Sequence, residues 1–271
     1  MALTEYQCSI LRLLAGERKE RGERYVAGGA ALNVLLSAPR LSRDIDLFHD
    51  TDAAIAASWA ADRQTLAADG HTLTVLREVP SFVEAVVSRG SERTAIQWAR
   101  DSAFRFYPLI EDEMLGLVLH PFDLATNKVL AMAGRLEVRD WIDVITCDQK
   151  LQPFGYLVWA ACGKDPGYNP HSLLAIARRQ RYSHAEVDTL AFSDYRPDAA
   201  LLGSQWHQIL EEAERIVTTL PPEEFGTGVM DDRGELCTAA ASSLENFVHE
   251  GRIRFHTGSI GGVWPQIKDR I

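Results

Sequence analysis

Polar and apolar residues follow two different periods along this chain, and the change of period separates an α/β part from a helical part. Residues 42–48 alternate with period two, which predicts a half-buried strand that presents Asp44 and Asp46 on one face. Directly upstream, residues 24–36 predict a short strand, a double-glycine turn and a helix. The chain therefore begins with a strand-turn-helix-strand unit that carries acidic residues.

The remaining elements follow from residue propensity and from glycine and proline breaks. We expect a first helix from Thr4 to near Gly22, further helices over residues 52–68, 154–162, 171–181, 202–220 and 236–249, and strands over residues 71–79, 82–88 and 93–100. Residues 122–149 predict one long helix or two abutting helices, with Gly134 as the break. The last twenty residues predict a short strand or a tail.

These elements predict an α+β protein, with a mixed sheet flanked by helices and followed by a mainly helical C-terminal part. The length of 271 residues allows one large domain or two modest ones, and we expect two. The predicted division is an α/β core over residues 1–118 and a helical domain over residues 119–271.

Composition excludes several classes of protein. The chain is 46% hydrophobic and 24% charged, which excludes collagen-like and wholly disordered chains. Its net charge of −10 is spread over both halves, so we do not expect a protein that acts by non-specific nucleic-acid binding. The four cysteines form no C-x-x-C pair, and we see no signal peptide and no long apolar run. We therefore expect a cytoplasmic protein without a membrane partner.

Two short motifs suggest a site for metal and phosphate. Two aspartates separated by one residue on a strand point the same way, so Asp44 and Asp46 can converge on one hard cation such as Mg²⁺. The turn at Gly28 and Gly29 would leave backbone N–H groups facing outward for phosphate oxygens. Each motif also has a purely structural interpretation: the Asp pair as an acidic strand end in water, and the Gly pair as a simple strand-to-helix turn. Their combination favours a nucleotide pocket.

The same motifs resemble a known family. The block Val26-Ala-Gly-Gly-Ala-Ala-Leu-Asn33, followed by Leu41-Ser-Arg-Asp-Ile-Asp-Leu-Phe48, resembles the G-G, spacer, D-x-D motif of the DNA polymerase β nucleotidyltransferase superfamily. More narrowly, it resembles the AbiEii/AbiGii-type toxin family. The downstream blocks at residues 122–131 and 135–143 resemble that family too. The resemblance covers about residues 20–150 and implies a nucleotidyltransferase sheet as the core.

The resemblance also implies roles for individual residues. Asp44 and Asp46 would hold Mg²⁺, Lys128 would bind the nucleotide phosphates, and Asp140 or Asp143 would support the site. We take the catalytic set to be Asp44, Asp46, Lys128 and Asp143. The residues expected to bind nucleotide are Gly28, Gly29, Ser42 at the rim, Arg43, Lys128, Arg135 and Arg139.

The downstream block has a physical argument of its own. On one continuous helix, Lys128, Arg135, Arg139 and Asp143 would fall within about 80° of one another. Such a stripe of three cations and one carboxylate faces either water or an anion such as a triphosphate. The angular argument requires an unbroken helix, so a break at Gly134 would remove it.

A third metal-binding carboxylate is harder to find. Family members often carry one on a later strand, but here Gln97 stands at the first place to look. Asp101 is the nearest substitute, and we include it with Asp44 and Asp46 in the predicted metal site. The number of bound metals is left open.

Together these features predict a Mg²⁺-dependent enzyme that moves an NMP from a nucleoside triphosphate to an acceptor hydroxyl. The resemblance favours a toxin that acts on tRNA or another RNA and is restrained by an antitoxin protein. Two alternatives stay open: an antibiotic-type small-molecule adenylyltransferase on the same core, and a nucleotide-binding module without catalysis.

Overall fold

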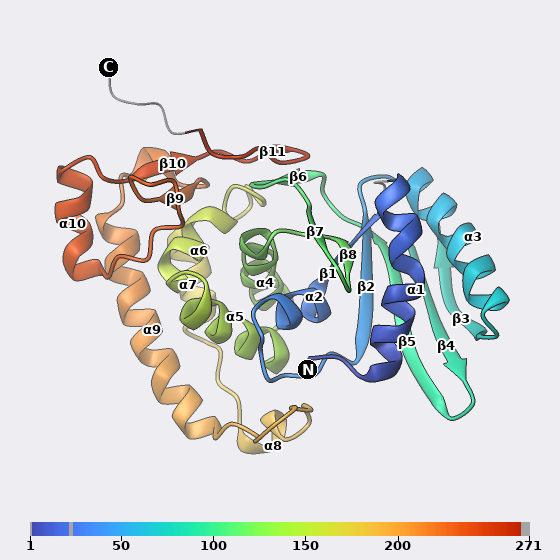
Figure 1. Ribbon diagram of the computed structural model, residues 1–271. Helices are drawn as coiled ribbons and strands as arrows, with labels where there is room; N and C mark the ends of the chain where they lie inside the picture. Colours follow the sequence, from blue (N-terminus) through green and yellow to red (C-terminus); the bar gives the residue numbers. More distant parts are fainter. Residues whose placement is uncertain (1, 22–23, 267–271) are drawn as a thin grey trace. The chain divides into compact units, whose positions relative to one another are not determined.

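The computed structural model describes residues 2–21 and 24–266, and the side chains of all of these except residues 16–21. The chain forms two compact units (Figure 1). The first unit consists of the described parts of Met1–Ala103, Leu109–His120 and Ala191–Asp194. The second consists of the described parts of Phe104–Pro108, Pro121–Leu190 and Tyr195–Ile271. None of the helices in the described part of the chain is long and apolar enough to cross a membrane.

A mixed sheet forms the centre of the first unit. Among the described residues it has seven strands in the order β3-β4-β5-β2-β1-β8-β7. They are β1 (Arg24–Ala27), β2 (Asp44–His49), β3 (Thr72–Val79), β4 (Phe82–Arg89), β5 (Glu92–Arg100), β7 (Ile110–Asp112) and β8 (Gly116–Val118). The pairs β2–β5 and β1–β8 are parallel, and the other pairs are antiparallel. The predicted mixed sheet is confirmed, including the β3–β5 meander.

Helices α1 (Glu5–Arg21) and α3 (Asp52–Ala68) pack on one face of this sheet, and α2 (Gly28–Leu35) follows β1 directly. Thr51 caps α3 by accepting a hydrogen bond from the backbone N–H of Ala54. The predicted first helix is confirmed over its described part, whereas its expected end at Gly22 lies outside the described residues.

Alternation along the strands decides which side chains face the helices. In β2, Ile45 and Leu47 are buried, while Asp44 and Asp46 are half-buried on the opposite face. On the face of the sheet that the helices cover, Trp98 of β5 links the sheet to α3. Its indole N–H donates a hydrogen bond to the buried Asp62 carboxylate of α3 over 2.8 Å. The Asp pair therefore lies on the face that α1 and α3 do not cover.

The second unit is mainly helical, as predicted. Its helices are α4 (Pro121–Arg135), α5 (Val138–Lys150), α6 (Phe154–Ala161), α7 (Pro170–Ala177), α8 (His184–Val187), α9 (Ala199–Thr219) and α10 (Ala241–His249), with a 3-10 turn at Pro222–Glu224. Short ribbons add β6 (Phe104–Arg105) paired with β11 (Ser259–Ile260), and β9 (Gly228–Met230) paired with β10 (Arg254–His256). Figure 1 shows α9 as the longest helix of this unit.

Two expectations about helix boundaries need correction. Residues 122–149 form two helices, and the break falls at Leu136, whose φ of 52° ends α4, while Gly134 stays inside α4. The helix predicted over residues 236–249 begins only at Ala241, because Cys237 is hydrogen-bonded to Val229 next to strand β9.

Candidate functional site

The double glycine lies where β1 passes into α2, and each glycine lies close to a polar side chain. Gly28 has φ of +64°, a conformation that other residues rarely adopt. A methyl group on Gly28 would overlap the Oδ2 atom of Asp46, and one on Gly29 would lie 2.5 Å from Nη2 of Arg40. The turn thus brings the first backbone atoms of α2 against a carboxylate and a guanidinium.

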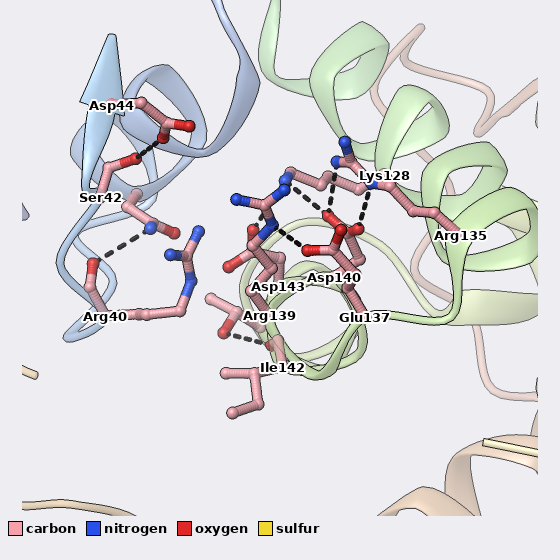
Figure 2. Close-up of polar contacts among 12 residues, drawn as sticks. Arg40, Ser42, Asp44, Lys128, Arg135, Glu137, Arg139, Asp140, Ile142 and Asp143 are labelled. Atoms are coloured by element: carbon pink, nitrogen blue, oxygen red, sulfur yellow. Dashed lines mark hydrogen bonds and ion pairs between the residues drawn. The ribbon is translucent and has the colours of Figure 1, made fainter. Parts of the chain in front are cut away.

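The aspartate pair is placed by β2. Asp46 lies opposite Ala27 of β1 and opposite Gln97 of β5. Asp44, two residues earlier on the same face, accepts a hydrogen bond from Ser42 Oγ at 3.4 Å (Figure 2). Ser42, predicted at the rim of the site, is buried. The predicted neighbours Gly28, Ser42, Asp44 and Asp46 are therefore brought together in the first unit.

Arg40 also belongs to this group, and no motif in the sequence predicts it. Its guanidinium lies beside Gly29 and donates from Nη1 to the Leu41 carbonyl over 3.2 Å. Its own carbonyl accepts a hydrogen bond from Asn33 of α2 over 3.0 Å. Arg43, the arginine that we had predicted to bind nucleotide, is exposed. The position of Arg40 two residues before Ser42 was the only signal in the sequence.

Gln97, which stands at the first place to look for a third carboxylate, lies on β5 opposite Asp46 of β2. Gln97 Nε2 donates a hydrogen bond to Glu84 Oε1 of β4 over 3.1 Å. Asp101, the predicted substitute, follows the end of β5, where its backbone N–H donates to the His49 carbonyl. His49 is three positions after Asp46 on β2, roughly 10 Å along a strand, so the structure does not place Asp101 beside the Asp pair.

Oxygen donors of this kind suit a hard cation. The described residues contain no group of three or more His, Cys, Asp or Glu side chains that could hold a metal ion by themselves. Mg²⁺ is commonly held through one or two carboxylates together with substrate phosphates. Asp44 and Asp46 fit that pattern, and the absence of a side chain at Gly28 leaves room for the Asp46 carboxylate beside it.

The second unit carries the predicted cationic block on a helical hairpin. Lys128 of α4 places Nζ 2.8 Å from Asp140 Oδ1 and 3.0 Å from Asp143 Oδ2 of α5 (Figure 2). Arg135, at the end of α4, places Nε 2.7 Å from Asp140 Oδ2 and Nη2 3.1 Å from Oδ1. Both carboxylates are buried, so the hairpin fixes the ammonium group from two sides.

Electrostatics at Asp140 follow from this packing. Burial alone would raise the pKa of the Asp140 carboxyl, but the charges and hydrogen bonds of Lys128 and Arg135 lower it below its usual value. Asp140 therefore stays ionised and holds the two cations in place. The sequence left the supporting role open between Asp140 and Asp143, and both contact Lys128.

The predicted stripe of three cations and one carboxylate needs correction. Because α4 and α5 are separate helices, Lys128 meets the acidic residues across the hairpin and not along one helix face. Arg139 pairs with Glu137, with 2.7 Å between Nε and Oε2. The cluster of Lys128, Arg135, Asp140 and Asp143 thus has equal numbers of cationic and anionic side chains.

Comparison with known proteins bears on the fold. No protein-family model and no curated protein sequence matches the chain. Among solved structures, JHP933 from Helicobacter pylori is similar, with a TM-score of 0.53 and 12% identity over 80% of this chain and 95% of that one. MenT4 (Rv2826c), a nucleotidyltransferase toxin from Mycobacterium tuberculosis H37Rv, gives a TM-score of 0.49 and 16% identity over 80% of this chain and 86% of that one.

At such low identity, the similarity to JHP933 establishes the fold alone. The predicted architecture, an α+β protein with a mixed sheet flanked by helices and a mainly helical C-terminal part, is confirmed.

Proposed function

We propose that this protein is a metal-dependent nucleotidyltransferase that transfers an NMP from a nucleoside triphosphate to an acceptor hydroxyl. The observation that carries the proposal is the contact between the Gly28 backbone and Asp46. It places the start of α2, where backbone N–H groups lack intrahelical acceptors, beside a carboxylate pair that suits Mg²⁺. Phosphate-binding and metal-binding groups thus adjoin within one unit.

In this proposal Asp44 and Asp46 hold Mg²⁺, which when bound would neutralise charge on the phosphate oxygens. Gly28 and Gly29 direct backbone N–H groups toward the triphosphate. The acceptor oxygen forms a bond to the α-phosphorus, the bond from that phosphorus to pyrophosphate breaks, and the hydroxyl proton is released. Such transfers depend on positioning and charge neutralisation, so few groups that form covalent bonds are needed.

Lys128 is assigned to the nucleotide phosphates, as the resemblance implies. Its ammonium is held in place by Asp140 and Asp143, which supports a role for Lys128 as a fixed point charge toward the phosphates. Because Asp140 also pairs with Arg135, it is a positioning residue for both cations. The roles of Arg135, Arg139 and Asp143 toward nucleotide remain part of the proposal.

For the acceptor we propose tRNA or another RNA, with the protein acting as a toxin that an antitoxin restrains. This part rests on the resemblance of residues 20–150 to the AbiEii/AbiGii-type toxin family. The cytoplasm is the location that fits such a substrate.

The test incubates the purified protein with Mg²⁺, each α-labelled NTP and total tRNA, and compares wild type with Asp46→Asn. Asp69→Asn, an exposed acid at the end of α3, is the matched control. We expect labelled RNA from wild type and from the control only. In a parallel incubation with aminoglycosides in place of tRNA, label on the aminoglycosides but not on RNA would make a small molecule the acceptor. NTP binding without pyrophosphate release would contradict the enzymatic proposal.

A further inference from the structure

A row of three polar side chains crosses the face of the sheet in the first unit that α1 and α3 do not cover. Strand register sets Asp46 of β2 opposite Gln97 of β5, and Gln97 opposite Glu84 of β4. Residues in register on neighbouring strands share one face of a sheet. All three side chains are half-buried. Gln97 is therefore the central member of the row, with a carboxylate on either side.

The hydrogen bond to Glu84 decides which way the Gln97 amide is turned. A carboxylate accepts hydrogen bonds and cannot donate one, so the NH₂ end of the amide must face Glu84. The structure shows this arrangement, with 3.1 Å between Nε2 and Oε1. The carbonyl oxygen of Gln97 is therefore not used by Glu84, and β2 with Asp46 is the strand on the other side of β5.

We propose that Gln97 supplies a neutral oxygen ligand to the metal held by Asp44 and Asp46, and that Glu84 positions Gln97 for this role. The inference rests on the proposed function. Amide carbonyl oxygens are accepted as ligands by hard cations. Carboxylates that orient a metal ligand through a hydrogen bond commonly change metal affinity by about 10–100-fold when they are removed.

This assignment has a consequence for the order of binding. A neutral third ligand leaves the site with two negative charges in place of the three that another carboxylate would give. Such a site binds the bare cation weakly and gains affinity when triphosphate oxygens complete the coordination. We therefore expect the metal to bind together with the nucleotide, and not before it.

The test uses Mn²⁺ as a spectroscopic probe, with its free concentration followed by electron paramagnetic resonance. Wild type is titrated with and without a non-hydrolysable NTP analogue. We expect at least about tenfold tighter Mn²⁺ binding with the analogue. Gln97→Ala and Glu84→Ala should each lower this nucleotide-dependent affinity about tenfold. Glu78→Gln, an exposed acid on β3 of the same sheet, is the control and should leave it unchanged.

A swapped variant, Gln97→Glu with Glu84→Gln, separates ligation from folding. It keeps a hydrogen bond between the two strands but puts a carboxylate at the third position. We expect Mn²⁺ binding without nucleotide to become at least about tenfold tighter than in wild type. Melting curves of all variants exclude unfolding as the cause of a loss.

The outcomes distinguish this inference from the function on which it rests. If wild type and Asp46→Asn bind Mn²⁺ and nucleotide equally poorly, the proposed function fails. If Asp46→Asn abolishes binding while folded Gln97→Ala and Glu84→Ala bind like wild type, the role of Gln97 and Glu84 is overturned and the function stands. A swapped variant with unchanged nucleotide-free affinity would also overturn that role.

Discussion

Lys128 of α4 and Asp140 of α5 form a buried ion pair, with 2.8 Å between Nζ and Oδ1. Asp140 has no measurable exposure and Lys128 very little, so neither charge is solvated when its partner is lost. The Asp140 carboxylate also accepts two hydrogen bonds from the Arg135 guanidinium. One carboxylate thus determines where two cations lie.

Removal of this carboxylate should be costly. Asp140→Ala would leave the buried Lys128 ammonium with Asp143 as its remaining carboxylate partner among the contacts described, so we expect a loss of about 3–5 kcal/mol in the free energy of unfolding. Urea denaturation measures it. Glu137→Gln breaks a more exposed pair with Arg139 and should cost less than about 1 kcal/mol. Equal effects of the two substitutions would contradict the buried network.

The glycine turn allows a substitution with a matched control. Gly28 and Gly90 have nearly the same φ, +64° and +63°, but a methyl group meets Asp46 only at Gly28 and open space at Gly90. Gly90→Ala should cost about 1–2 kcal/mol, the price of left-handed backbone. Gly28→Ala should cost more and should also lower affinity for the NTP analogue, measured by calorimetry. Similar losses at both sites would argue against the Asp46 contact.

His49 should make stability depend on pH. Burial lowers the pKa of His49 from 6.5 to about 4, because loss of contact with water disfavours the charged form of the ring. The unfolded chain therefore binds more protons between these values, so this stability is present above pH 6.5 and is lost as pH falls toward 4. The loss is on the order of 3 kcal/mol.

Denaturation curves from pH 7 to pH 4 test this dependence. His49→Asn should flatten the curve over that range, even if it lowers stability at pH 7. An unchanged slope in His49→Asn would assign the acid sensitivity to other groups.

Asp123 should control the order of the segment Phe104–Pro108. Its two carboxylate oxygens accept hydrogen bonds from the backbone N–H groups of Phe106 and Tyr107, at 2.8 and 2.9 Å, and Lys164 pairs with the same carboxylate at 2.8 Å. Asp123→Ala should speed amide hydrogen exchange in that segment by at least tenfold, about 1.4 kcal/mol or more.

Hydrogen exchange followed by mass spectrometry provides the measurement for Asp123. Asp165→Ala, which affects only an exposed turn at Gly167, serves as the control and should leave exchange at Phe106 unchanged. Protection at Phe106 and Tyr107 that survives in Asp123→Ala would mean that other contacts hold the segment.

Periodicity was sufficient to predict the strand that carries the Asp pair. The alternation of Asp44, Ile45, Asp46 and Leu47 reports burial directly, and the structure has the same alternation. Strands β7 and β8 were not predicted, because three residues each are too few to show a period. The sheet was therefore predicted in type but not in extent.

The meeting of Lys128 with acidic residues was expected for the wrong geometric reason. Gly134 carried the sequence signal for a break, but the turn falls at Leu136, a residue with no intrinsic preference for positive φ. Tertiary packing of α4 on α5 decides the turn, and propensity does not report it. The pair of Gln97 and Glu84 was likewise hidden, since it depends on the register of two strands.

The path of the chain through its two units has a practical consequence. Ala191 and Ser193 donate or accept backbone hydrogen bonds with Leu41 and Pro39, although about 150 residues separate them along the chain. A chain truncated after Val118 would lose the hydrogen bonds that Ala191 and Ser193 make to Leu41 and Pro39. No single truncation yields either unit whole. Split-protein reporters and domain exchange with relatives should therefore fail at this cut unless the segment Ala191–Asp194 is kept together with the rest of the first unit.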